Sequence, residues 1–245
     1  MADRRRLDVE VAERGLTTSR ARAQALILAG KVTVDGRFVT KAGTAVTPDA
    51  VIEVLEPDHP YASRGALKLE VALDTFGVDP TGLDCLDVGA STGGFTDLLL
   101  TRGAARVIAL DVGKGQLDWR LRTDSRVIVM EGINARHLGA DDLPFLVALV
   151  TVDVSFISLR MVVPALRPHL TPGARLVCLV KPQFEAGRDQ VGKGGIIRDE
   201  AVRRRVIDDT VSAITALGFE LVGVVPSPIR GQKGNLEELA VFRGR

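Results

Sequence analysis

The feature that most constrains the fold is a regular alternation of short apolar runs with amphipathic segments after residue 83. Such alternation predicts an α/β domain with a mostly parallel sheet and helices on both faces. Ligands of these sheets bind beyond the carboxyl ends of the strands. The seven strand-like runs cover residues 84–89, 106–113, 126–132, 145–155, 174–180, 219–225 and 236–243. The functional residues are therefore expected where these runs end.

Composition sets further bounds. At 245 residues, 46% hydrophobic and with a mean hydropathy of +0.16, the chain can bury the core of one α/β domain plus a small module. The uncharged run 143–152 is far shorter than the roughly 20 residues of a membrane span, which favours a soluble cytoplasmic protein. Cys85 and Cys178 lie in apolar runs and are expected to be reduced core residues. The three histidines lack ligand spacing, so no metal site is expected.

Residues 1–56 follow a different pattern and predict a small α+β domain. A short helix is followed by a second one, with Thr18 or Ser19 as its N-cap and a stop at Gly30. A hairpin turning at Asp35-Gly36 comes next. The prolines in "EPDHPYASRG" then predict a stiff linker over 57–64, so that the second domain covers 65–245.

The N-terminal segment carries excess positive charge. Residues 1–48 hold nine Lys and Arg against five Asp and Glu. Arg20 and Arg22 lie in the first turn of the second helix, where the helix dipole disfavours cations. This placement costs stability unless an anion such as phosphate is the partner, although a solvated basic face is an equal alternative on charge alone.

Two helices followed by "AGKVTVDGRFV" shift that balance, because the pattern resembles the alpha-L domain, an RNA-binding module of a ribosomal protein and of many pseudouridine synthases. RNA is therefore the expected partner. The candidate RNA-binding residues are Arg4, Arg6, Arg20, Arg22 and Arg64.

The segment "DVGASTGGFTD" is the clearest ligand motif, since a strand enters a glycine-rich turn and then a helix. Ser91 stands where a dinucleotide fingerprint requires glycine, so the turn fits a nucleoside without pyrophosphate better than NAD. Asp111 lies 22 positions after Gly89, the spacing of an acid that accepts ribose hydroxyls. With Asp87 before the turn, these features favour bound S-adenosylmethionine over a purely structural turn. Asn134 is a candidate adenine contact or a surface turn residue.

Charged residues also stand at the ends of later strands. Asp153 and Lys181 end the fourth and fifth strands, and Glu237 begins the last. Lys68 lies beside the apolar stripe of a helix that starts near residue 65 and ends at Gly77. Alone, each would be read as a capping or snorkelling side chain. Glu238 adjoins Glu237, and strand alternation lets only one of the two face the ligand.

Together, Lys68, Asp153, Lys181 and Glu237 resemble the Lys-Asp-Lys-Glu tetrad of FtsJ-like ribose methyltransferases. With "YASRGALKL", "DVSFIS", "LVKPQFE" and "GNLEE", the chain resembles the haemolysin-like TlyA family of ribosomal RNA cytidine 2'-O-methyltransferases almost throughout. The resemblance implies a Rossmann-like class I methyltransferase fold and a ribosomal RNA substrate, 16S, 23S or both, within ribosomal subunits. It implies that Gly89, Ser91, Thr92, Gly93 and Asp111 line the S-adenosylmethionine site.

Transfer of a methyl group to a ribose 2'-hydroxyl requires removal of the hydroxyl proton. A lysine can be the base when desolvation and a second ammonium bring its pKa near neutrality. Lys181 is the expected base, Lys68 supplies the second positive charge, and Asp153 and Glu237 position the lysines. The glycine-rich segment 185–200 is expected to order over RNA, or else to be a disordered surface loop.

Three alternatives stay open at this point. A methyltransferase of another RNA or a small molecule would share the cofactor motif. A non-catalytic RNA-binding assembly factor would retain the fold, although the complete tetrad argues against it. A membrane-lysing protein would need a long apolar or amphipathic segment, which the sequence lacks. The sequence does not decide the modified nucleotide or the oligomeric state.

Overall fold

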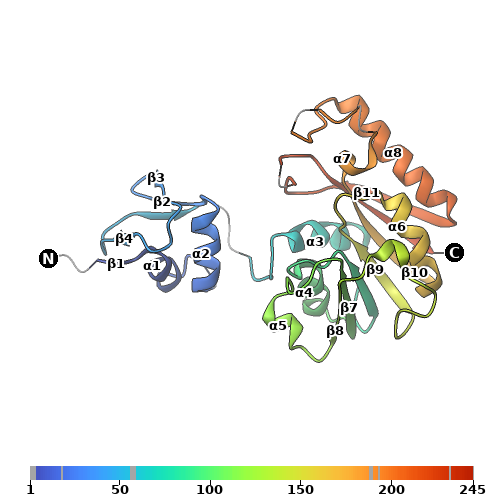
Figure 1. Cartoon of the computed structure of the whole chain (residues 1–245), viewed down its shortest axis with the longest axis horizontal. Coiled ribbons are helices and arrows are strands. Elements are labelled where there is room, and N and C mark those ends of the chain that lie inside the picture. The colour runs from blue at the N-terminus through green and yellow to red at the C-terminus, as the bar shows by residue number, and fades with distance from the viewer. Residues whose placement is uncertain are drawn as a thin grey trace. The chain divides into compact units, whose positions relative to one another are not determined.

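The computed structural model describes residues 4–17, 19–55, 59–187, 190–192, 194–231 and 233–244. The chain forms two compact units, Met1–Pro60 and Tyr61–Arg245 (Figure 1). The division lies inside the segment predicted as a linker. Several residues that carry sequence predictions lie outside the described ranges, namely Thr18 as a cap, linker residues 57 and 58, and residues 188, 189 and 193 of the glycine-rich segment.

The N-terminal unit consists of two helices and short antiparallel strands around a small core of Leu, Ile, Val and Ala side chains. The Ser19 hydroxyl accepts a hydrogen bond from the backbone N–H of Arg22, so Ser19 is the N-cap of the second helix. The hairpin turns at Asp35 and Gly36, which both have positive φ angles, 50° and 73°. The elements are β1 (Arg5–Arg6), α1 (Leu7–Glu13), α2 (Arg20–Leu28), β2 (Val32–Val34), β3 (Arg37–Phe38), β4 (Ala45–Val46) and β5 (Ile52–Val54).

The second unit contains the seven-stranded sheet that the alternation predicts. Its strand order is β11-β12-β10-β9-β6-β7-β8, and β12 runs antiparallel to both neighbours while the other pairings are parallel. The strands are β6 (Asp84–Val88), β7 (Arg106–Asp111), β8 (Val127–Glu131), β9 (Val147–Val152), β10 (Leu170–Val180), β11 (Phe219–Pro226) and β12 (Glu238–Gly244). The predicted mostly parallel α/β fold is confirmed.

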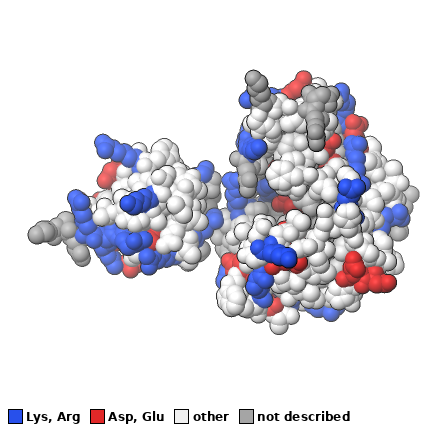
Figure 2. Space-filling view, viewed as in Figure 1, with Lys and Arg blue, Asp and Glu red and all other residues white. Residues whose placement is uncertain are grey.

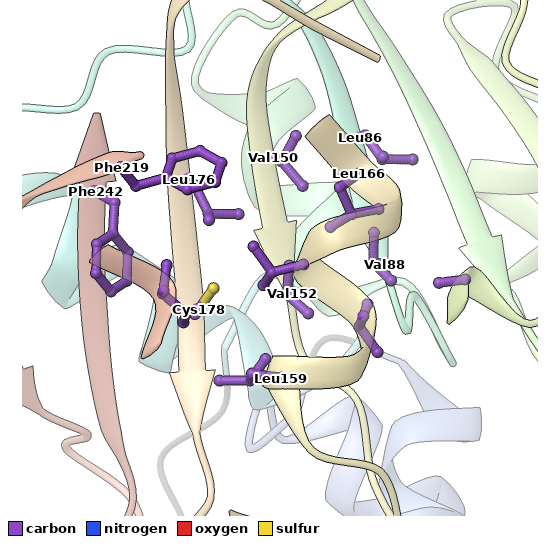
Figure 3. Packing of buried hydrophobic residues seen from close by; sticks show 14 of the residues in the cluster. Leu86, Val88, Val150, Val152, Leu159, Leu166, Leu176, Cys178, Phe219 and Phe242 are labelled. Atoms are coloured by element: carbon purple, nitrogen blue, oxygen red, sulfur yellow. The ribbon is translucent and has the colours of Figure 1, made fainter. Parts of the chain in front are cut away.

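Helices cover both faces of this sheet (Figure 1). Alternate strand residues point to opposite faces, so Leu86 and Val88 pack with α6 and α8, whereas Cys85 packs with α3 and α4. Figure 3 shows the first of these two cores, in which Leu159 and Leu166 of α6 lie against side chains of β6, β9 and β10. The helices are α3 (Gly65–Phe76), α4 (Gly94–Thr101), α5 (Trp119–Arg122), η1 (Ala135–His137), α6 (Leu159–Leu166), η2 (Arg167–His169), α7 (Pro182–Glu185) and α8 (Glu200–Ala216).

Some element boundaries differ from those predicted. Strand β10 begins at Leu170 rather than residue 174. Its register with β9 shifts between Leu170 and Arg175, where an exposed Pro-Gly pair lies, and these two residue types argue against a strand in the sequence. Strand β12 begins at Glu238, so Glu237 lies in the preceding loop. Within the described parts of the chain, no helix combines the length and apolar character needed to cross a bilayer.

Candidate active site

A cavity of about 440 Å³ lies beyond the carboxyl ends of β6, β9 and β10 in the second unit. This is the edge of the sheet at which parallel α/β folds bind ligands. Its walls come from segments that are far apart in the sequence. They include Ser63–Gly65, Lys68, Gly89–Thr92, Gly94, Phe95, Asp153, Ser155, Phe156, Lys181, Gln183, Phe184, Gly195, Gly231, Lys233, Asn235 and Glu237.

The glycine-rich turn between β6 and α4 forms one wall. Gly89 has a φ of 85°, and a Cβ at this position would collide with the backbone carbonyl of Asp153. Gly93 has a φ of 95°, and a Cβ there would collide with the Leu121 side chain. The sharp turn leaves the backbone between them open to the cavity, where Ser91 and Thr92 are lining residues.

Asp111 is tied to this turn from the neighbouring strand. Its Oδ2 accepts a hydrogen bond of 2.8 Å from the Ser91 backbone N–H, and its Oδ1 accepts one of 2.6 Å from that of Gly113. The carboxylate at the end of β7 is thereby fixed beside a residue that lines the cavity. This is the position expected for an acid that accepts ribose hydroxyls.

Asp87 takes a different position from the one predicted. Its side chain is completely buried, and its oxygens accept hydrogen bonds of 2.7 Å from Thr96 Oγ1 and 3.0 Å from Thr151 Oγ1. Burial raises the pKa of this carboxyl to about 7. Asp87 is fully buried and does not line the cavity, so in place of the predicted ligand contact it joins β6 to α4 and β9 through these hydrogen bonds.

Lys68 and Glu237 meet at the cavity wall. Lys68 Nζ lies 2.6 Å from Glu237 Oε2, and the two side chains are only 11% and 3% exposed. The neighbouring Glu238 instead forms an ion pair of 2.8 Å with Arg203 of α8 and does not line the cavity. The sequence left open whether Glu237 or Glu238 faces the ligand, and the structure places Glu237 at the cavity.

A second lysine–carboxylate pair lies on the same cavity. Lys181 Nζ, just before α7, is 2.5 Å from Asp153 Oδ1, which follows β9. The ammonium also donates a 2.9 Å hydrogen bond to Ser155 Oγ. The structure therefore brings all four predicted tetrad residues to one cavity, and it adds Ser155, which the sequence reasoning missed although it lies two residues after Asp153.

Two aromatic rings stand at this part of the cavity. Phe156 is 87% exposed and has a φ of 65°, an uncommon conformation for a bulky residue. Its ring centroid lies 5.0 Å from that of Phe184, which follows Lys181 on α7. Neither residue carried a signal that pattern reasoning could use, because lone aromatic residues in apolar runs are usually assigned to the core.

Two polar side chains, the partly buried Glu185 and the buried Asn235, fix the loops that carry these groups. Glu185 accepts hydrogen bonds of 2.6 Å from Ser158 Oγ and 2.8 Å from the backbone N–H of Leu159, and burial raises its pKa. It joins the segment of Lys181 to the loop of Asp153. Asn235 accepts a hydrogen bond from the Ile197 backbone N–H and donates one to the Gly195 carbonyl. It joins the glycine-rich segment to the loop of Glu237.

The other predicted site residues lie elsewhere. Asn134 is exposed, and its side chain caps η1 by accepting a hydrogen bond from the Arg136 N–H. Arg64 lines the cavity, whereas Arg4, Arg6, Arg20 and Arg22 belong to the N-terminal unit. Among the described residues, no three His, Cys, Asp or Glu side chains gather in a way that could hold a metal ion.

This geometry coincides with a known class. Residues 61–245 match the FtsJ-like methyltransferase family, and residues 5–52 match the S4 domain, here the module predicted as alpha-L. The class of protein is therefore an FtsJ-like methyltransferase with an N-terminal S4 domain.

Individual relatives narrow the class. The chain is 48% identical to the 16S/23S rRNA (cytidine-2'-O)-methyltransferase TlyA of Mycobacterium tuberculosis, over 97% of this chain and 89% of that protein. It is 44% identical to Hemolysin A of Brachyspira hyodysenteriae, over 97% of this chain and 99% of that protein. A solved structure of a candidate hemolysin from Streptococcus thermophilus has a TM-score of 0.78 at 39% identity, with 100% and 90% of the two chains covered. The chain belongs to the TlyA family, as the sequence motifs indicated.

Proposed function

We propose that this protein transfers a methyl group from S-adenosylmethionine to the ribose 2'-hydroxyl of a cytidine in ribosomal RNA. The observation that carries the proposal is the convergence of two lysine–carboxylate pairs on one cavity beyond a glycine-rich turn. The activity named for the relative from Mycobacterium tuberculosis supports the choice of substrate. A ribosomal substrate, within either ribosomal subunit, assigns the activity to the cytoplasm.

The cavity fits S-adenosylmethionine. Its volume of about 440 Å³ lies in the usual range of roughly 300–1,000 Å³ for small-molecule sites. Gly89, Ser91, Thr92 and Gly93 would hold the ligand along the turn, and Asp111 would accept its ribose hydroxyls. When bound, S-adenosylmethionine supplies an electrophilic methyl group on a sulfonium. Asn134 is kept as a candidate contact of the adenine, because it follows β8 and is exposed.

Lys181 is proposed to accept the proton of the 2'-hydroxyl. A lysine accepts a proton only through its neutral amine, and its Nζ must lie within hydrogen-bond reach of the hydroxyl. Asp153 and Ser155 hold this Nζ from the protein side, at 2.5 and 2.9 Å. The lone pair of the nitrogen can then face the cavity, where the substrate oxygen would lie.

Lys68 is proposed to stabilise the negative charge that develops on the substrate oxygen. Its ammonium is held by Glu237 in a nearly buried pair, so it needs little rearrangement during the reaction. Gly231 packs against this pair, because a Cβ there would collide with Glu237 Oε1. Both lysines are therefore fixed by an acid on one side and open to the cavity on the other.

The test is methyl transfer to ribosomal subunits. The protein is incubated with S-adenosylmethionine labelled in its methyl group and with purified small or large subunits, and the labelled RNA is digested to nucleosides. Label in 2'-O-methylcytidine is expected. Label confined to another position, another RNA or a small molecule would contradict the proposal, as would the absence of any transfer.

A further inference from the structure

Helix α1 of the S4 domain carries two buried carboxylates that are two residues apart, Asp8 and Glu10. Asp8 is 0% exposed and Glu10 is 6% exposed. Buried charges are costly unless they are paired, and both residues are paired with arginines. The two sets of arginines differ in what they leave exposed to solvent.

Asp8 holds two arginines from different elements. Arg6, before α1, donates from Nε to Oδ1 at 2.9 Å and from Nη2 to Oδ2 at 3.1 Å. Arg20, at the start of α2, donates from Nε to Oδ2 at 3.0 Å. Gln24, one turn further along α2, donates to the same oxygen at 2.6 Å. The carboxylate is thus the common anchor for side chains that are remote in sequence.

The guanidinium groups anchored in this way remain accessible. The Arg6 and Arg20 side chains are 53% and 55% exposed, although Asp8 beneath them is fully buried. Arg20 uses only Nε toward Asp8, and among the described residues its two terminal nitrogens have no protein partner. Lys and Arg side chains are prominent on the visible face of this unit (Figure 2).

Glu10 provides the contrast. One partner, Arg5, is 46% exposed and pairs with Glu13 as well as Glu10. The other partner, Arg14, is 29% exposed, and all three nitrogens of its guanidinium bind within the domain. Arg14 donates from Nε to Glu10 at 2.8 Å, from Nη1 to the Ala50 carbonyl at 2.7 Å and from Nη2 to the Pro48 carbonyl at 2.9 Å. Arg14 therefore ties α1 to the segment before β5, and it has no donor directed at a ligand.

We propose that Asp8 is a positioning residue, which preorganises two of the arginines already expected to bind RNA, Arg6 and Arg20, for a phosphate of the RNA backbone. The inference rests on the proposed function, because it deepens the RNA binding assumed there. Guanidinium groups bind phosphate through two parallel hydrogen bonds, and this requires a fixed orientation. Three charged side chains leave the cluster with a net charge of +1, which suits an anion.

Preorganisation and simple charge attraction predict opposite effects for one substitution. Asp8→Asn removes a negative charge beside the RNA, and attraction alone would then tighten binding. If Asp8 serves to orient the arginines, the same change releases two long side chains that must be ordered again on binding. We expect roughly threefold to tenfold weaker binding of ribosomal subunits by Asp8→Asn, despite the added positive charge.

Glu10→Gln is the matched control, because it makes the same change of charge two residues away in the same helix. Its binding is expected to equal or exceed that of the wild type. Filter binding of the full chain to purified small and large ribosomal subunits, over a series of salt concentrations, gives affinity and salt slope for each variant. Circular dichroism and amide exchange report whether the S4 domain is folded.

A second pair of variants decides the question should Asp8→Asn fail to fold. Arg6→Lys with Arg20→Lys keeps both charges but removes the planar fork, so weaker binding is expected, whereas Arg37→Lys on exposed β3 should bind as the wild type does. Folded Asp8→Asn, or the double lysine variant, binding as tightly as wild type would overturn the inference alone. A wild-type protein that binds neither subunit would overturn the RNA-binding proposal as well.

Discussion

The two units of this protein arrange opposite charges in opposite ways. In the methyltransferase unit, the side chains of Lys68 and Lys181 are only 11% and 10% exposed and are held by acids at the wall of a cavity. In the S4 unit, Arg6 and Arg20 are more than half exposed, and the acid that holds them is buried. In the first arrangement the cation is shielded from water, and in the second it is presented to the surface.

This difference indicates what each set of charges can do. An ammonium that is nearly removed from water interacts strongly with a few fixed neighbours. An exposed guanidinium keeps its charge and can bind a phosphate with little dehydration. We therefore propose proton transfer for Lys181, stabilisation of the developing negative charge for Lys68 and RNA docking for the exposed arginines, and the following experiments test these roles.

The largest expected effect is on turnover. Lys181→Ala should lower the rate of methyl transfer by roughly 100-fold or more, the range for a positioned acid–base group. Affinity for S-adenosylmethionine and for ribosomal subunits should be retained. Single-turnover kinetics with separate binding titrations measures both quantities. If Lys181→Ala instead loses affinity for a ligand and keeps its rate of methyl transfer, Lys181 binds a ligand and does not transfer the proton.

The adjacent glutamates give a matched pair. Glu237→Gln breaks the contact with Lys68 at the cavity and should lower methyl transfer by roughly tenfold or more, because the ammonium loses its fixed partner. Glu238→Gln breaks a similarly buried contact with Arg203 outside the cavity. It should reduce the free energy of unfolding and leave methyl transfer by the folded protein nearly unchanged. Equal effects of both variants on turnover would contradict the assignment.

A smaller effect is expected at the cofactor. Asp111→Ala should weaken binding of S-adenosylmethionine by roughly tenfold to 100-fold, since a hydrogen bond to a charged group contributes about 1.5–3 kcal/mol and the Ser91 turn also loses an acceptor. Subunit binding should persist, because the S4 domain is unchanged. Isothermal titration calorimetry on the isolated variant measures the affinity, and an unaltered value would remove Asp111 from the site.

The smallest effect concerns stability and pH. Asp87 is buried between hydroxyls, with a pKa raised from 3.8 to about 7, whereas the equally buried Asp8 lies among guanidiniums that lower its pKa. Between about pH 4 and 7 the folded state keeps a proton on Asp87 that the unfolded state has lost. This contribution to stability is therefore present at the acidic end and is lost as pH rises toward 7.

Asp87→Asn should flatten that part of the profile. Urea unfolding of the variant and the wild type between pH 4 and 7.5 measures the difference, and the raised pKa of Glu185 contributes equally to both proteins. Identical pH dependence in the two proteins would mean that Asp87 is ionised in the folded state, and the contrast with Asp8 would then fail.

Much of the fold could be predicted because the side chains of a strand alternate between the two faces of the sheet. Leu86 and Val88 point to one face of β6 and Cys85 to the other, and this alternation recurs in the neighbouring strands. The strand ends then bring Asp153 and Lys181 together without any further information. Strand alternation alone could not show whether Glu237 or Glu238 faces the cavity. That choice depends on where β12 begins and on the ion pair between Glu238 and Arg203 of α8.

Other parts depended on contacts that leave no pattern in the sequence. Asp8, Arg6 and Arg20 come from three positions whose shared hydrogen bonds follow from the packing of α1 against α2. Ser155 and Phe156 lie in a loop after β9 that has no periodicity, and Phe156 adopts a positive φ. Asp87 was assigned to the ligand because it precedes the glycine turn, but strand alternation directs it beneath α4 toward Thr96.

The most direct test of proton transfer by a buried lysine is the single-turnover rate of methyl transfer by Lys181→Arg. Arginine keeps the positive charge at the cavity but cannot release its proton near neutral pH. If Lys181 transfers the proton, Lys181→Arg is expected to bind S-adenosylmethionine and ribosomal subunits and to be nearly as inactive as Lys181→Ala. A Lys181→Arg protein that methylates RNA at a rate close to the wild type would contradict this role and leave Lys181 as an electrostatic contact for the substrate oxygen.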